Sequence, residues 1–287
     1  MSLLALHDVP APAKLNLFLH VLGRRDDGYH LLQSVFALID WCDTLDFERR
    51  DDGGLARHDR GAVLPAEDLC LRAARLLQSA SGCRWGADIH IDKRVPWGAG
   101  LGGGSSDAAS TLLALNRLWG LNWSRERLLE LALRLGADVP FFVAGTNAWV
   151  EGIGECLRPI ELVPRWWAVL KPAESLATAA VFASPTLARN TPAATLSDFA
   201  ANPAGFGRND LECAVLAHSS EVAEALQLLR SRFGASRMTG SGSAVFADAG
   251  LGSAPTLPMP LARDLPPNWV ARMCRGLERH PLQAWAA

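Results

Sequence analysis

A glycine-rich segment over residues 95–107 constrains the fold of this 287-residue chain more than any other feature. It reads VPWGAGLGGGSSD and places five glycines among the seven residues 98–104. Glycine lets the backbone approach a bulky anion and adopt positive φ without strain. A helical pattern of apolar residues follows from Ala108 to Leu118, so the first turn of that helix would direct unpaired N–H groups and its positive dipole end at the loop. The segment predicts a loop that binds the phosphates of a nucleotide.

Two common nucleotide-binding loops do not fit this segment. A Walker A loop needs a lysine directly after its glycines, and none is present. The letters of a dinucleotide fingerprint are met by Gly98, Gly100 and Gly103, but the residues before them alternate between polar and apolar, and residues 119–124 carry no carboxylate. An ordinary surface loop is also disfavoured, because five glycines cost backbone entropy without a turn that needs them.

Composition excludes several classes of partner. The net charge is −2, from 28 basic and 30 acidic residues, so a general basic surface for nucleic acid is not expected and anion recognition must be local. The chain has neither an N-terminal signal pattern nor an apolar run of about 18 residues, so we expect a cytoplasmic protein without a membrane partner. Six scattered cysteines without a C-x-x-C pair indicate neither a zinc site nor a disulfide framework. The sequence does not indicate an oligomeric state.

Hydrophobic periodicity predicts alternating strands and helices. We expect strands over residues 14–21, 33–39, 44–49, 87–92, 147–151 and 166–170, and strands on either side of residues 239–243. We expect helices over residues 67–79, 124–135, 178–184, 210–217 and 221–233, besides the one after the glycine loop. The pattern of residues along the chain changes near residue 158, so we divide it into domains at 1–157 and 158–287. Residues 253–267 contain five prolines and are expected to form a loop.

Two short segments place charged side chains in defined positions. In the first strand, Lys14 and Asn16 alternate with apolar residues, so they project to the same face. Asp138 lies between Gly136, which would end one helix, and Pro140, which suits the first turn of the next. We expect a short bend that holds the Asp138 carboxylate.

Four segments together resemble the motifs of the GHMP kinases, a family that includes galactose, homoserine, mevalonate and phosphomevalonate kinases. They occur in the family's order and span most of the chain: PAKLNL at 12–17, PWGAGLGGGSS at 96–106, GADVPFF at 136–142 and TGSGSAVF at 239–246. The resemblance implies an α+β fold of two domains, with mixed and antiparallel sheets, helices, and a cleft between the domains. The proline-rich residues 253–267 depart from the helix that the family has there.

The resemblance implies that ATP is the co-substrate and that Mg²⁺ bridges its phosphate oxygens; it names no metal ligand. The predicted ATP-binding residues are Pro96, Gly98, Ala99, Gly100, Leu101, Gly102, Gly103, Gly104, Ser105 and Ser106, with Leu69 and Lys93 at the adenine. Ser105 and Ser106 are also candidates for a simple helix cap, a role that uses the same N–H groups as phosphate binding.

By the same resemblance, Asp138 is the base that accepts the proton of the acceptor hydroxyl, and Lys14 supplies positive charge to the transferred phosphoryl group. The alternatives are that Asp138 only caps the helix at Pro140 and that Lys14 is an ordinary exposed lysine. Further residues expected to bind the substrate are Asn16, Gly240, Gly242 and Ser243, although the last three are also compatible with a plain turn between strands.

Residues 22–30 and 189–192 are similar to those family members that phosphorylate a polyol linked to cytidine diphosphate, in the non-mevalonate route to isoprenoids. The resemblance implies that Tyr29 and Phe182 stack on the two faces of the cytosine and that His30 hydrogen-bonds to its edge. Thr178, one helical turn before Phe182, would face the same pocket. The alternative for Tyr29 is a loop aromatic that packs against the protein.

Two other functions stay open at this stage. A GHMP kinase that acts on a sugar, homoserine or mevalonate would share the phosphate loop, but these substrates carry no base for Tyr29 and Phe182 to hold. A regulator of this fold would bind ATP without turnover, but it would have no need of Lys14 and Asp138.

Overall fold

Two β-sheets and their covering helices make up the computed structural model, which describes residues 3–61, 63–253, 255 and 265–286. The first sheet has the order β3-β4-β2-β5-β6, with β1 paired to β2, and among its described strands only the β3–β4 pair is parallel. Its strands are β1 (Ala5–Arg24), β2 (His30–Arg50), β3 (Leu55–Arg60), β4 (Gly86–Asp92), β5 (Ala148–Glu151) and β6 (Cys156–Pro159). The second sheet is antiparallel in the order β10-β7-β9-β8. Its strands are β7 (Trp166–Lys171), β8 (Arg237–Met238), β9 (Val245–Gly250) and β10 (Val270–Arg275).

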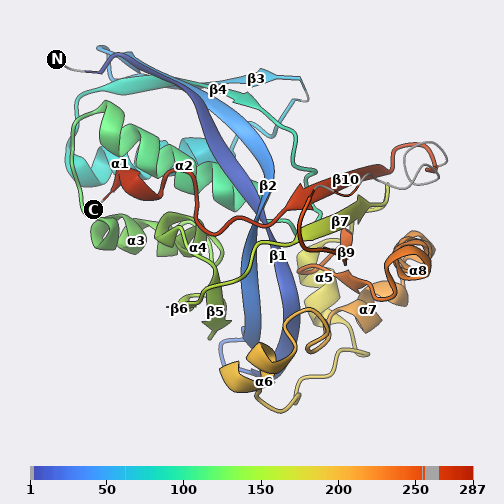
Figure 1. Cartoon of the computed structure of the whole chain (residues 1–287). Coiled ribbons are helices and arrows are strands. Elements are labelled where there is room, and N and C mark those ends of the chain that lie inside the picture. The colour runs from blue at the N-terminus through green and yellow to red at the C-terminus, as the bar shows by residue number, and fades with distance from the viewer. Residues whose placement is uncertain (1–2, 62, 254, 256–264, 287) are drawn as a thin grey trace.

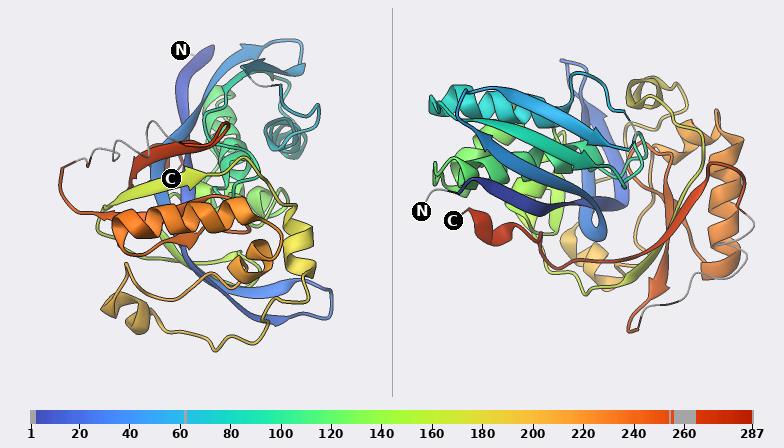
Figure 2. Two further views of the ribbon diagram at one scale, coloured as in Figure 1. Left: turned by 90° about the vertical axis from the view of Figure 1, so that its right-hand side faces the viewer. Right: turned by 90° about the horizontal axis from the view of Figure 1, so that it is seen from above.

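Helices cover each sheet separately. The helices that pack with the first sheet are α1 (Leu69–Ser81), α2 (Gly103–Leu118), α3 (Arg125–Leu133) and α4 (Val139–Ala144). The later helices are α5 (Thr178–Ala183), α6 (Leu196–Ala201), α7 (Glu212–Leu216) and α8 (Ser220–Phe233). α8 lies against the second sheet, at the opposite end of the molecule from α1 and α2 (Figure 2). The α+β class with mixed and antiparallel sheets is confirmed.

The long hairpin of β1 and β2 connects the two halves of the molecule (Figure 1). β1 contributes to all three apolar cores, because Ala11 packs with α1 and α2, Leu15 packs between the sheets, and Val21 packs with α8. This strand is therefore buried on both faces, and its polar residues Lys14 and Asn16 lie inside the protein. Each half of the molecule thus supplies neighbours to the same strand.

The separate strands expected over residues 33–39 and 44–49 are one strand, and that expectation was wrong. β2 continues through an irregularity at Asp40 and Trp41, opposite the step between Pro12 and Ala13 on β1. The bulge accommodates the extra residues without a turn. The sequence pattern also missed β3, β6, α6 and β10, which are short and whose residues are mostly exposed or only partly buried. The loop expected over residues 253–267 falls largely outside the described residues.

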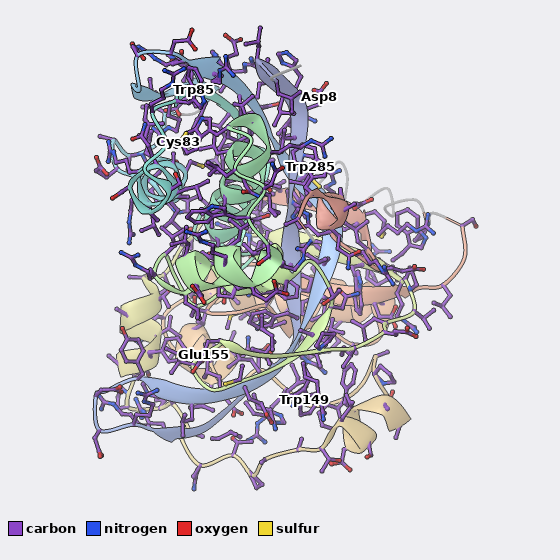
Figure 3. The ribbon with its side chains drawn as sticks, turned by 90° about the vertical axis from the view of Figure 1, so that its left-hand side faces the viewer. Asp8, Cys83, Trp85, Trp149, Glu155 and Trp285 are labelled. Carbon is purple, nitrogen blue, oxygen red and sulfur yellow. The ribbon has the colours of Figure 1, made fainter. Side chains whose placement is uncertain are left out.

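The C-terminal segment returns to the first half of the chain. After β10, Leu277 donates its N–H to the carbonyl of Leu38, and His280 donates to the carbonyl of Gly145. The final turn places Trp285 beside α2 (Figure 3), with the Arg117 guanidinium 5.1 Å from the centre of its ring. In the described part of the chain, no helix is both long enough and apolar enough to cross a membrane. The division into domains near residue 158 stays a prediction.

Candidate active site

A cavity of about 1060 Å³ brings together residues from both halves of the chain. It is lined by most of the residues singled out from the sequence: Lys14, Asn16, Tyr29, His30, Leu69, Lys93, Pro96, Gly98, Ala99, Gly100, Leu101, Gly102, Gly103, Gly104, Ser105, Asp138, Thr178, Phe182 and Gly240. Ser106, Gly242 and Ser243 lie behind the wall of this cavity rather than on it. The glycine loop, the Lys14–Asp138 pair and the residues of the predicted base pocket therefore open into one continuous space.

Backbone contacts with two other segments fix the glycine loop. The N–H of Lys14 donates to the carbonyl of Leu101 at 2.9 Å, and the N–H of Ala244 donates to the carbonyl of Ala99 at 3.0 Å. Gly100 has a φ of +75° and lies so near Thr239 that a Cβ would be 2.2 Å from the Thr239 carbonyl oxygen. The loop is thus held between β1 and the loop that joins β8 to β9, and only glycine fits at residue 100.

Helix α2 begins directly at the loop. Gly102 is its N-cap, in the left-handed region at φ 72°, and no side chain caps the helix. Ser105 and Ser106 lie within the first turn, so the alternative that they cap this helix is wrong. Ser105 lines the cavity, whereas Ser106 is fully buried and its Oγ has no hydrogen-bond partner within the described residues. The first N–H groups of α2 have no partner within the helix, which suits a phosphate.

Lys14 and Asp138 meet in the cavity wall, with Nζ 3.6 Å from Oδ2. Lys14 is 3% exposed and Asp138 is 31% exposed, so the carboxylate is the accessible member of the pair. Nζ of Lys14 also donates to Oδ1 of Asn16 and lies 4.8 Å from the centre of the Phe36 ring. Burial lowers the pKa of Lys14, and Asp138 opposes this shift only in part.

Both alternative roles for this pair are contradicted. Lys14 is not an exposed strand lysine, because β1 is buried on both faces. Asp138 occupies the N-cap position of α4, but its side chain makes no capping hydrogen bond and instead pairs with Lys14. Asn16 is held by Ser34, whose Oγ lies 3.0 Å from Asn16 Nδ2, and by the hydroxyl of Thr239, which accepts the Asn16 N–H at 2.9 Å. The pair is therefore supported from three segments of the chain.

The Lys93 ammonium group forms ion pairs with two acidic side chains, Asp43 and Asp107. Burial lowers the pKa of Lys93, but the two acidic groups outweigh it, so the net direction is upward. Burial raises the pKa of Asp107. Asp43 also accepts the backbone N–H groups of Arg94 and Val95, at 2.6 and 2.7 Å. Lys93 thus ties the start of the phosphate loop to β2 and α2, while its predicted contact with adenine stays a prediction.

The residues of the predicted base pocket line the same cavity. Tyr29 is 60% exposed, and the rings of His30 and Phe182 are 5.0 Å apart at 31°. α5 carries Thr178 and Phe182 one turn apart, and the hydroxyl of Thr178 is 2.9 Å from that of Ser241. The stacking roles stay predictions, but these side chains all line the cavity.

Arg189 is the residue of this pocket that the sequence pattern did not single out. Its Nε donates to Nε2 of His30 at 3.0 Å, and its other nitrogens donate to the carbonyls of Phe182, Ser184 and Leu187 at 2.9 to 3.0 Å. Asp43 and Asp107 were also missed. Arg189 lies in one of the segments that carried the resemblance, but no local pattern indicates a contact between residues 159 positions apart.

The loop at residues 239–243 joins two paired strands, as the turn alternative expected. Its Gly240 also reaches the cavity, and Asn209 Nδ2 donates to the Gly240 carbonyl at 2.8 Å. Ser243 is fully buried and donates to the carbonyl of Glu174. Gly242 and Ser243 therefore support this loop from within, whereas Gly240 lines the cavity, and the substrate contacts expected of all three stay predictions.

Comparison with known proteins finds family matches in both halves of the chain. The model of the GHMP kinases N terminal domain matches residues 68–146, and the model of the GHMP kinases C terminal domain matches residues 190–249. The chain is 74% identical over 286 residues to the 4-diphosphocytidyl-2-C-methyl-D-erythritol kinase of Methylibium petroleiphilum, with 100% of each chain covered. It is 56% identical to the kinase of the same name from Paracidovorax citrulli, with 98% of each covered.

Two solved structures of kinases superpose on most of this chain. A crystal structure of 4-(cytidine 5'-diphospho)-2C-methyl-D-erythritol kinase superposes with a TM-score of 0.77 at 36% identity and covers 93% of this chain and 98% of that one. The Methanococcus jannaschii mevalonate kinase superposes with a TM-score of 0.64 at 13% identity and covers 96% and 99%. The second likeness concerns the fold alone.

Proposed function

Because the chain belongs to the GHMP kinase family, we propose that it transfers the γ-phosphoryl group of ATP to the 2-hydroxyl of 4-diphosphocytidyl-2-C-methyl-D-erythritol. The observation that carries this proposal is the single cavity that joins a phosphate loop, a Lys14–Asp138 pair and an aromatic pocket. ATP would lie with its phosphates over Gly98–Ser105, and the cytidine would lie at Tyr29, His30 and Phe182. The reacting hydroxyl would then be brought to the Lys14–Asp138 pair between them. Both ligands would be small molecules of the cytoplasm.

Asp138 is suited to act as the general base. Its carboxylate reaches the cavity, and its side chain is not used to cap α4. In the reaction, Asp138 accepts the proton of the 2-hydroxyl, the freed oxygen forms a bond to the γ-phosphorus, and the bond from that phosphorus to the β–γ bridging oxygen breaks. ADP carries away that electron pair.

Lys14 is suited to stabilise the charge on the moving phosphoryl group. It is buried, so its interaction with an anion is screened less than it would be in water. Phe36 and Asn16 restrict the position of its ammonium group, and the ion pair with Asp138 keeps it beside the general base. A fixed ammonium needs no reorganisation as charge develops on the phosphoryl oxygens.

Mg²⁺ fits the oxygen atoms beside the phosphate loop. The described residues contain no group of three or more His, Cys, Asp or Glu side chains that would hold a metal by themselves. Two buried oxygens at the start of α2, Ser106 Oγ and Asp107 Oδ1, have no hydrogen-bond partner there. Mg²⁺ prefers oxygen ligands and is often held by one or two protein groups together with substrate phosphates. Of the two, Asp107 lines the cavity and would hold the ion with ATP, and the ion would supply positive charge to the phosphates.

A coupled assay of ADP release tests this function against the alternatives. The purified protein is given ATP and Mg²⁺ with 4-diphosphocytidyl-2-C-methyl-D-erythritol, mevalonate, homoserine or galactose in turn. We expect ADP release with the cytidine substrate alone. Release with one of the other acceptors would indicate a different GHMP kinase, and binding of ATP without release for any acceptor would indicate a regulator.

A further inference from the structure

The contact between Arg189 and His30 determines which nitrogen of the imidazole carries its proton. Nε of Arg189 donates to Nε2 of His30 at 3.0 Å. A guanidinium has only donors, and a neutral imidazole has one donor nitrogen and one acceptor nitrogen. Nε2 must therefore be the acceptor, which leaves the proton on Nδ1.

Arg189 cannot readily leave this contact. Its NH1 donates to the carbonyl of Leu187, and its NH2 donates to the carbonyls of Phe182 and Ser184. These bonds tie the guanidinium to the end of α5, the helix that carries Phe182. The same side chain thus fixes Phe182 and His30 relative to each other.

His30 is held in the neutral form. Burial lowers its pKa, and the positive charges of Arg189 and Arg24 lower it further. Within the described residues, Nδ1 of His30 has no hydrogen bond to the protein, although the side chain lines the cavity beside Phe182. The Nδ1–H group is therefore a donor that remains available to a ligand.

We infer that Arg189 is a positioning residue for base selection, which holds His30 as a hydrogen-bond donor and so favours cytosine over uracil at this end of the cavity. The inference rests on the proposed cytidine substrate. Ring nitrogen N3 of cytosine is an acceptor and pairs with Nδ1–H, whereas N3 of uracil carries a hydrogen and meets it donor to donor. A site built around such a donor rejects the base that cannot accept from it.

Competition binding of CDP and UDP tests the inference in the full chain. We expect Arg189→Met to reduce the preference for CDP over UDP by about tenfold, the effect of one hydrogen bond lost at a buried edge. The control is Arg232→Met, which removes an exposed arginine on α8 and should leave the preference unchanged. If Arg189 acts through His30, then Arg189→Met in the His30→Ala background should change the preference no further. An undiminished preference in Arg189→Met contradicts the inference.

A long-range ¹H–¹⁵N spectrum of the imidazoles measures the tautomer without any ligand. We expect the His30 signals, assigned by their loss in His30→Ala, to show protonation at Nδ1 in the wild type and a shift toward Nε2 in Arg189→Met. A wild-type ring protonated at Nε2 overturns the inference, and this result does not depend on how the variant folds. Failure of the proposed function looks different: the wild-type protein would then bind CDP no better than UDP.

Discussion

Gly100 lies against Thr239 so closely that a Cβ on residue 100 would be 2.2 Å from the Thr239 carbonyl oxygen. The two residues come from opposite halves of the sequence, and their contact joins the phosphate loop to the loop between β8 and β9. Because Thr239 also accepts the N–H of Asn16, the contact extends to the strand that carries Lys14. The geometry of the phosphate loop therefore depends on both halves of the chain.

The first prediction concerns this contact. Gly100→Ala must separate the two backbones or strain a residue at φ +75°, so we expect the free energy of unfolding to fall by about 1–3 kcal/mol. We also expect ATP affinity to fall by at least about tenfold, because the phosphate-binding N–H groups move. Calorimetry and thermal unfolding measure the two effects. In the control Gly23→Ala, a Cβ meets only Leu31 at 3.8 Å, and both values should stay near wild type.

Replacement of Lys14 separates function from stability. Burial lowers the pKa of Lys14 more than Asp138 raises it, so the charged lysine costs the folded protein free energy at neutral pH. Asp138 is 31% exposed, so water can solvate its carboxylate once Lys14 is removed, and we expect Lys14→Met to lose nearly all turnover and yet to raise the free energy of unfolding at pH 7 by about 1 kcal/mol. For the wild type, the unfolded chain holds the Lys14 proton up to higher pH, so this residue's contribution to stability rises as pH increases between the folded and unfolded pKa values. Denaturation of Lys14→Met at a lower urea concentration than wild type would contradict this account.

The aromatic pocket gives a third prediction. Stacking of a base on an aromatic side chain is worth about 1–3 kcal/mol by alanine substitution. Tyr29→Ala and Phe182→Ala should therefore weaken CDP binding by roughly 5-fold to 150-fold, with ATP affinity nearly unchanged because the phosphate loop is untouched. Unaltered CDP affinity in both variants, measured by calorimetry, would mean that no base stacks there.

Local patterns in the sequence were enough to predict the parts of the site that lie within one segment. The glycine loop and its helix, the common orientation of Lys14 and Asn16, and the bend at Asp138 each depend on residues close in sequence. Glycine, proline and strand alternation act at that range. The glycine loop and the bend were therefore placed correctly before their partners were known, whereas phosphate binding by the loop stays a prediction.

The contacts that hold these parts together were not predictable in the same way. Asp43 binds Lys93 from 50 residues away, and Arg189 binds His30 from 159 residues away. Neither residue is part of a periodic pattern, and only the fold brings the partners together. Burial of Lys14 was missed for a related reason, because alternation in one strand does not reveal that helices and a second sheet cover both of its faces.

We propose that Asp138 activates the 2-hydroxyl of the cytidine substrate for attack on ATP beside Lys14. A single-turnover experiment with γ-labelled ATP and 4-diphosphocytidyl-2-C-methyl-D-erythritol tests it most directly, with the wild type and Asp138→Asn compared at equal occupancy of ATP. We expect label on the 2-hydroxyl in the wild type and a rate about 10² to 10⁴ lower in Asp138→Asn, because a general base has been removed. If Asp138→Asn transfers the label within about threefold of the wild-type rate, the fall in rate is far smaller than removal of a general base produces, and Asp138 is not that base.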